Sequence, residues 1–301
     1  MKVPQRFRII HLIFLLLSVQ VAKSQELMLD SNMLHINVSA YGTAYNSVFD
    51  RDGERKQTTD ILHGGLNLQS EVWLNSRWNL MLNAPLLIYN NAAASNAPGG
   101  LIEDESKVGT GDIEIGIRYG IKPYRKWSAA FSIWQSTASG TRDEKTFLHT
   151  GFDDYYTRLG FQIQFKQNQG FYLSTLVSFT NRNKGFSDEL QAGIYSRIHL
   201  YKSLHLQLYA NGIQPLENGD EEPIIYQYGL YHNNWGISQT GADLLLKNKS
   251  NAEFFIGINT PIKGQYIYTS SVVRLGALVK LNLKKKSNNP LILQEEKATL
   301  K

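Results

Sequence analysis

The run from residue 109 to residue 121 alternates between apolar side chains and charged or glycine residues. Ile115 and Ile117 share one face of an extended chain, whereas Glu114 and Arg118 occupy the other face. Two-residue periodicity of this kind predicts a β-strand with one apolar and one polar face. In a soluble sheet the apolar face would pack on a core. In an outer-membrane barrel it would face lipid, and the charged face would line the lumen.

Residues 1–24 have the three parts of a secretory signal peptide. Basic residues at positions 2, 6 and 8 precede an apolar stretch from 9 to 17, and Ala22-Lys23-Ser24 places small residues at the cleavage site. The apolar stretch is shorter than the ~20 residues that a membrane-spanning helix needs, so an uncleaved anchor is disfavoured. We expect the mature chain to start at Gln25, outside the cytoplasm.

The charge balance argues against nucleic acid as a partner. The formal net charge is +5, but four of the 31 basic residues and none of the 26 acidic ones lie in residues 1–24. The mature chain therefore has 27 basic against 26 acidic residues. Five of those lysines lie in residues 284–301, which we predict to form a solvated periplasmic tail. A folded domain without a basic surface is not expected to bind nucleic acid.

Alternating segments recur along the mature chain, separated by turn-forming clusters of Gly, Asn, Asp and Lys. The predicted strands span roughly residues 33–48, 60–74, 77–90, 109–122, 126–138, 154–166, 170–181, 187–200, 203–214, 236–247, 251–260 and 270–283. Short and long connections alternate, as they do in bacterial outer-membrane barrels with short periplasmic turns and longer extracellular loops. The sequence therefore predicts an all-β fold, a transmembrane antiparallel up-and-down β-barrel of about 12 strands (10–14) within residues 25–283.

Aromatic side chains gather beside the short turns. Trp73 and Trp78 flank the first short turn, Trp127 follows the second, and Tyr201 lies in the fourth. Aromatic rings are enriched at membrane–water interfaces, so this placement favours a girdle at the periplasmic side of a barrel. The less specific explanation is that aromatic residues are common in strands.

The two faces of the predicted strands have different expected surroundings. Apolar rows would face lipid, among them Leu80, Leu82, Ala84, Leu86 and Ile88. Charges on the opposite face would be pore-lining: Glu71, Asp112, Glu114, Arg118, Arg158, Arg197, Arg274 and Lys280. Such charges can set the selectivity of a pore for a polar or aromatic solute. They could instead pair across a narrow interior and close it, and the sequence leaves both arrangements open.

Several stretches resemble a known family. The strand pair at residues 64–85, which ends in an Ala-Pro step, and the run Gly109-Thr-Gly-Asp-Ile-Glu-Ile-Gly-Ile-Arg-Tyr119 are similar to the outer-membrane transporter family linked to the meta-cleavage pathway of phenol degradation. Residues 187–193, Ser-Asp-Glu-Leu-Gln-Ala-Gly, also resemble it. The resemblance covers about residues 33–283 and implies a barrel related to fatty-acid channels, with a transport role. It carries over no ligand residues.

Motifs for catalysis are weak. Outer-membrane lipases place a His-x-Ser pair on one strand face, and no histidine of the mature chain has serine two residues on. The pair Gly109 and Gly111 lacks the third glycine and the following helix of a phosphate loop. We therefore predict no enzyme activity, no cofactor and no metal site.

These features together predict a bacterial outer-membrane β-barrel that acts as a channel or transporter for passive uptake of a small solute, aromatic and hydrophobic solutes included. One alternative is a closed structural or surface-interaction barrel. An outer-membrane lipid hydrolase is a more distant alternative. The expected partners are outer-membrane lipid, the small-molecule solute and, during biogenesis, the barrel-assembly machinery.

Overall fold

The computed structural model is an all-strand structure in the part of the chain that it describes. It describes residues 33–92, 95–97, 100–102, 105–124, 126–141, 148–167, 171–219, 234–248 and 251–283. The predicted signal peptide (1–24) and periplasmic tail (284–301) lie outside these residues. No helix in the described ranges is long and apolar enough to cross a bilayer.

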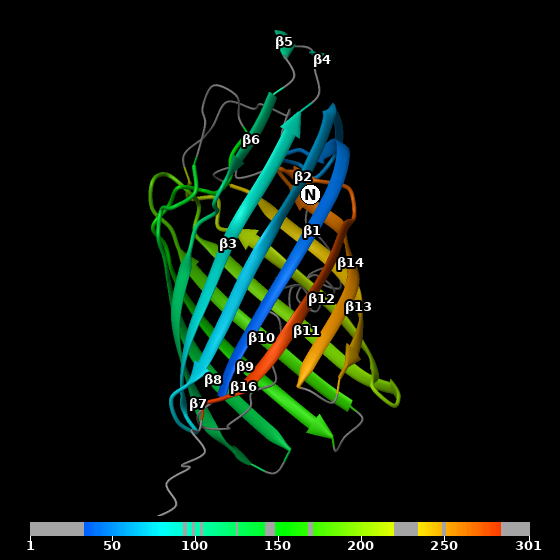
Figure 1. Cartoon of the computed structure of the whole chain (residues 1–301). Coiled ribbons are helices and arrows are strands. Elements are labelled where there is room, and N and C mark those ends of the chain that lie inside the picture. Colours follow the sequence, from blue (N-terminus) through cyan, green and yellow to red (C-terminus); the bar gives the residue numbers. More distant parts are fainter. Residues whose placement is uncertain are drawn as a thin grey trace, which may run out of the picture.

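Within the described residues, twelve antiparallel strands close into a barrel (Figure 1). The strands are β1 (Met33–Phe49), β2 (Arg55–Trp73), β3 (Trp78–Ala92), β7 (Glu114–Tyr124), β8 (Trp127–Ser136), β9 (Thr157–Gln167), β10 (Phe171–Asn181), β11 (Glu189–Tyr201), β12 (Leu204–Pro215), β13 (Gly236–Lys247), β14 (Ala252–Gln265) and β16 (Val272–Asn282). The ring closes where β1 pairs with both β2 and β16. Closure leaves no barrel strand with a free edge, which lipid could not satisfy. The predicted up-and-down barrel is confirmed.

Short strands extend the end of the barrel that carries the long loops. β6 (Glu105–Gly109) pairs with β3 beyond the start of β7, and β15 (Ile267–Tyr268) pairs with β1 beyond the start of β16. Each continues a barrel strand after a short break. β4 (Ser95–Ala97) and β5 (Gly100–Ile102) form a separate hairpin that projects past the barrel (Figure 1).

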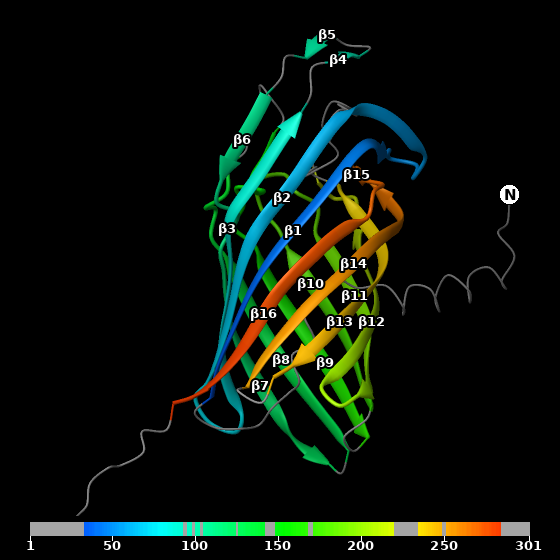
Figure 2. The same ribbon diagram turned by 45° about the vertical axis from the view of Figure 1, so that its right-hand side comes forward.

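β1 begins and β16 ends at the opposite end of the barrel, which carries the short turns (Figure 2). In the first of these turns, the side chain of Asn75 accepts hydrogen bonds from the backbone N–H groups of Arg77 and Trp78, at 2.8 and 2.9 Å. Lys202 and Asn251 take a positive φ of 46° and 61° in two other turns. Tight hairpin connections require this left-handed backbone. The predicted separation of short turns from long loops is therefore confirmed.

The exterior of the barrel is apolar and its interior is polar. In β7 the exposed fractions of Ile115 and Ile117 are 56% and 47%, whereas those of Glu114 and Arg118 are 5% and 7%. Large exposed apolar side chains recur on every barrel strand, and Asn, Gln, Glu and Asp side chains are prominent among the buried ones. A soluble domain has the reverse arrangement. This orientation is that of a transmembrane barrel, with lipid outside and a wet lumen inside.

One predicted orientation is wrong, and one aromatic side chain assigned to the girdle does not face outward. A β-bulge leaves Leu86 without a partner in β2, and the extra residue reverses the alternation that follows it. Ile88 therefore points inward and is buried, although Leu80 in the same predicted row is exposed. Trp73 also points inward, on the face that carries Glu71, and its exposed fraction is 1%.

Candidate functional site

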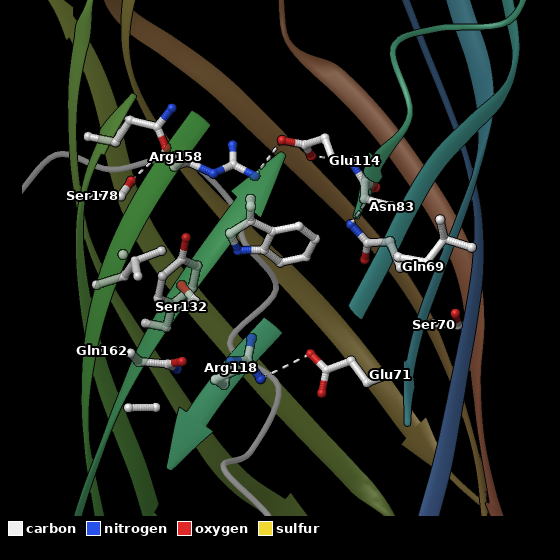
Figure 3. A pocket seen from close by; sticks show the side chains of 17 residues that line it. Gln69, Ser70, Glu71, Asn83, Glu114, Arg118, Ser132, Arg158, Gln162 and Ser178 are labelled. Carbon is white, nitrogen blue, oxygen red and sulfur yellow. Dashed lines mark hydrogen bonds and ion pairs between the residues drawn. The ribbon is translucent and has the colours of Figure 1, made fainter. Parts of the chain in front are cut away.

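The candidate site is the polar interior, where the predicted inward charges form ion pairs. Arg118 of β7 contacts Glu71 of β2 at 3.1 Å, and Arg158 of β9 contacts Glu114 of β7 at 2.5 Å (Figure 3). In each pair one strand lies between the partners, so the pair runs along the barrel wall. Neighbouring strands are about 4.8 Å apart, a spacing that lets long side chains bridge one intervening strand. We call these four residues the first wall.

Neighbouring polar groups occupy the remaining acceptor positions of the first wall. Glu114 Oε1 also accepts a hydrogen bond from the Tyr156 hydroxyl at 2.7 Å, and Glu114 Oε2 accepts one from the Asn83 amide at 2.7 Å. Glu71 Oε2 accepts a hydrogen bond from the Asn79 amide at 3.0 Å. Buried ion pairs are tolerated only when hydrogen bonds of this kind satisfy their other polar atoms. The first wall is therefore a preorganised polar surface.

A second network of charges lies on strands β11 to β16. Arg197 contacts Glu253 at 3.2 Å, and Arg274 donates to both carboxylate oxygens of Asp243, at 2.8 and 2.5 Å. Gln207 joins the two pairs, because it donates to Asp243 at 3.1 Å and accepts from Arg197 at 3.1 Å. We call these five residues the second wall. Its arginines were predicted to face inward, and its acids complete the pairs.

Two glycines make room for the second wall. The guanidinium of Arg274 lies 4.7 Å from the ring centre of Tyr209, and the Tyr209 ring lies directly on Gly241. A Cβ atom at Gly241 would collide with that ring, and a Cβ atom at Gly257 would collide with the carboxylate of Asp243. Glycine is needed at both positions because no side chain fits there. The arginine is thus held by a carboxylate and an aromatic face together.

One residue predicted to line the pore, Asp112, takes another position. Asp112 lies in the break before β7, and its carboxylate accepts hydrogen bonds from the backbone N–H groups of Gly140 at 2.9 Å and Phe152 at 2.6 Å. It therefore holds a loop. Lys280 shares the strand face of Arg274, six residues earlier, and pairs with the buried His35 of β1 near the short-turn end of the barrel.

The segment 148–156, between β8 and β9, folds into the outer mouth of the barrel. Leu148 joins a buried apolar cluster with Tyr45 of β1, and Phe152 packs against a second cluster that contains Trp235. β8 and β9 lie far around the ring from β1 and β13, so the segment reaches into the lumen from one side toward the other. We call it the mouth segment.

Arg182, directly after β10, ties the mouth segment to the barrel. Its Nε donates to Asp154 at 3.1 Å, its Nη1 donates to Glu189 at 2.6 Å, and its guanidinium lies 3.9 Å from the ring centre of Phe152. Glu189 also accepts a hydrogen bond from the indole N–H of Trp235 at 2.9 Å. Burial raises the pKa of Asp154, and the charge of Arg182 opposes that rise. One buried cation thus joins three connections at the mouth.

Two neighbouring cavities inside the barrel share part of their lining. The central cavity, about 160 Å³, is lined by the first wall and by residues of β8 to β11 (Figure 3). The outer chamber, about 320 Å³, lies beside the mouth segment, and Arg182 and Trp235 are part of its lining. Arg158 and Gln191 line both cavities. The two spaces therefore adjoin at the ion pair between Arg158 and Glu114.

The residues of the mouth give little signal in the sequence. Arg182 lies in an Asn-Arg-Asn-Lys stretch that resembles ordinary solvated turn charge. Asp154 falls at the start of a predicted strand, but β9 begins at Thr157 and Asp154 belongs to the mouth segment. Asp243 and Glu253 of the second wall, by contrast, obey the two-residue alternation that identifies their arginine partners.

Comparisons with known proteins agree with the barrel fold. Neither a protein-family model nor a curated protein matches the chain. Among solved structures, the chain is similar to an outer membrane channel from Pseudomonas putida F1, with 9% identity and a TM-score of 0.66 over 87% of this chain and 100% of that one. It is also similar to the NanC porin, with 9% identity and a TM-score of 0.49 over 82% of this chain and 100% of that one.

The likeness to the Pseudomonas channel establishes a shared fold, since an identity of 9% carries no residue-level correspondence. It is consistent with the resemblance of the sequence to an outer-membrane transporter family. Closed barrels with an apolar exterior and a polar interior span bacterial outer membranes. The chain is therefore a β-barrel of the bacterial outer membrane, with the fold of an outer-membrane channel.

Proposed function

We propose that the chain is a channel for the passive passage of a small solute. The observation that carries the proposal is that the two cavities lie on either side of Arg158, so that space for a solute extends from the mouth to the level of Arg118 with only side chains between its two parts. The ion pairs of both walls run along the barrel wall, so they neutralise the interior without bridging the lumen. The proposed pore-lining residues are Glu71, Glu114, Arg118, Arg158, Arg197, Arg274 and Lys280.

Swelling of proteoliposomes in an isosmotic glycine solution tests this passage. We expect the refolded mature chain to let glycine enter, and the double variant Glu114→Ala with Arg158→Ala to speed entry because it removes the side chains between the two cavities. Both partners are removed together, since a single change would leave a buried charge unpaired. Arg77→Ala, in an exposed short turn, serves as the control and should swell like the parent chain. Proteoliposomes with folded barrel that exclude glycine would overturn the proposal.

A closed structural or surface-interaction barrel is the second candidate. The mouth segment and its buried contact with Arg182 favour it, because they narrow the outer opening. A closed barrel should exclude glycine in the parent chain and in the double variant alike, since the block would lie at the mouth above the cavities. The same swelling measurement therefore separates the two candidates.

We propose no catalytic role, in keeping with the outer membrane channel whose fold the chain shares. A phospholipid hydrolysis assay on the refolded protein should give the rate of protein-free vesicles. The apolar exterior supports outer-membrane lipid as a partner, and insertion by the barrel-assembly machinery follows from the same proposal.

A further inference from the structure

The outer chamber combines aromatic walls with charged groups. The rings of Tyr41, Phe152, Tyr156, Trp235 and Tyr268 are part of its lining. Two arginines, Arg158 and Arg182, line it together with a single acid, Glu189. A cavity of about 150 Å³ is enough to hold a benzene molecule. The chamber, at about 320 Å³, has room for a single-ring solute with a polar substituent.

The acceptor atoms of the chamber are already occupied. Glu189 Oε1 accepts from Arg182 and from Trp235, and Glu189 Oε2 accepts from the Gln191 amide at 3.4 Å. Glu114, which holds Arg158 from the first wall, has both carboxylate oxygens in hydrogen bonds. A ligand that offered only donors would find few free acceptors on these two acids.

The donor groups of the two arginines, by contrast, are partly unused. A guanidinium carries five N–H donors. In the described part of the chain, Arg158 makes one side-chain hydrogen bond, from Nη2 to Glu114. The Nη2 of Arg182 is buried and has no hydrogen-bond partner among the described residues. Arg158, whose side chain is partly accessible, therefore offers unused N–H donors next to aromatic surface, and this favours a ligand that supplies acceptors.

We propose that the outer chamber is a binding site for a small single-ring aromatic carboxylate. The ring lies against the aromatic side chains, and the carboxylate accepts hydrogen bonds from Arg158, with Arg182 as the second cation of the site. Arginine binds carboxylates in a planar, two-pronged geometry, and aromatic rings stack on one another and on guanidinium groups. The inference rests on the proposed function only in its account of how the solute arrives, because binding can be measured without passage.

Titration of the refolded, detergent-solubilised mature chain with benzoate tests the site. Binding is followed by tryptophan fluorescence. The variant Trp235→Phe shows which part of the fluorescence change comes from the chamber. Benzamide is the neutral probe of the same shape, and cyclohexanecarboxylate is the charged probe without an aromatic ring. We expect benzoate to bind at least about tenfold more tightly than benzamide, since a hydrogen bond to a charged group is worth about that factor. We expect it to bind more tightly than cyclohexanecarboxylate as well, because that probe cannot stack on the aromatic side chains.

Two arginine variants locate the site. Arg158→Gln should remove the preference for benzoate over benzamide, and Arg158→Lys should retain part of it because the charge remains. Arg197→Gln, which removes a lumen arginine outside the chamber, should leave the preference intact. Equal affinity for benzoate and benzamide, or equal effects of Arg158→Gln and Arg197→Gln, would overturn the inference. If glycine still enters proteoliposomes in that case, the channel proposal stands and only the chamber site fails.

Discussion

The lumen walls are built by strands, whereas the outer mouth is built by connections gathered around one buried arginine. In the walls, each predicted inward arginine meets an acid on a strand two or three positions away. In the mouth, Arg182 joins the mouth segment, the start of β11 and the residue before β13. The walls therefore divide their charge among many strands, and the mouth depends on a single side chain.

The largest difference between the two regions should appear when one arginine is removed from each. Arg182→Ala leaves Asp154 and Glu189 buried without their cation, at a local cost of about 3–5 kcal/mol. We expect hydrogen exchange in the mouth segment to become fast while the strands stay protected. Arg274→Ala is the matched change in the second wall and should leave the mouth segment protected. If both variants release the mouth segment equally, the mouth and the walls do not differ in the way described.

A charge on the lipid-facing side of the barrel should have the next largest effect, in this case on the free energy of unfolding. Ile117→Lys places a cation on the exposed face of β7 near mid-strand, and such a change costs about 2–4 kcal/mol at the bilayer midplane. Ile262→Lys, near the outer end of β14, is the control and should cost about 0–1 kcal/mol because it lies near the interface. Urea unfolding in lipid vesicles measures both. Equal costs would contradict the assigned depth of the two residues.

A smaller effect is expected at the mouth from Asp112→Asn. Gly140 and Phe152 donate to different carboxylate oxygens, so the amide keeps only one of the two acceptors and also loses the charge, at about 1–2 kcal/mol. Hydrogen exchange at the backbone amides of Gly140 and Phe152 should become faster, but by a smaller factor than hydrogen exchange in the mouth segment of Arg182→Ala. Unchanged exchange at both would mean that Asp112 does not hold the loop. Asp52→Asn, in an exposed turn, is the control.

The smallest effect should come from a change in the first wall, and it should appear in the ion selectivity of the pore. Arg118→Ala leaves the carboxylate of Glu71 without its cation, so the lumen gains one uncompensated negative charge. A unit charge at about 4 Å in water is worth about 1 kcal/mol, or a factor of about five in preference for cations. Reversal potentials in a salt gradient measure this shift, and Arg77→Ala should show none. A shift toward anions would contradict the inward placement of the pair.

The walls could be predicted from the sequence because a strand alternates its faces. Once Ile115 and Ile117 are assigned to the lipid-facing side, the alternation places Glu114 and Arg118 on the inward side. This reasoning holds wherever the strand is regular. It fails at Ile88, where the bulge at Leu86 inserts one residue and reverses the parity. The local signal is Pro85, directly before Leu86, because proline within a sheet is found mainly at edges and bulges.

The mouth could not be predicted because loops have no such periodicity. Arg182 gains its role only from residues distant in the chain, and the inward path of the mouth segment is fixed by apolar contacts of Leu148 and Phe152 with remote strands. Asp112 was placed in the lumen by alternation from Glu114, but the chain leaves the strand between β6 and β7. Its partners Gly140 and Phe152 follow from tertiary packing.

Single-channel recording of the refolded mature chain in a planar bilayer tests the central claim most directly, which is that the paired lumen leaves a path for small solutes. We expect steady openings of small conductance in the parent chain and larger openings in Arg182→Ala, because release of the mouth segment widens the outer opening. A silent bilayer with correctly folded barrel, for the parent chain and for Arg182→Ala, would contradict the claim.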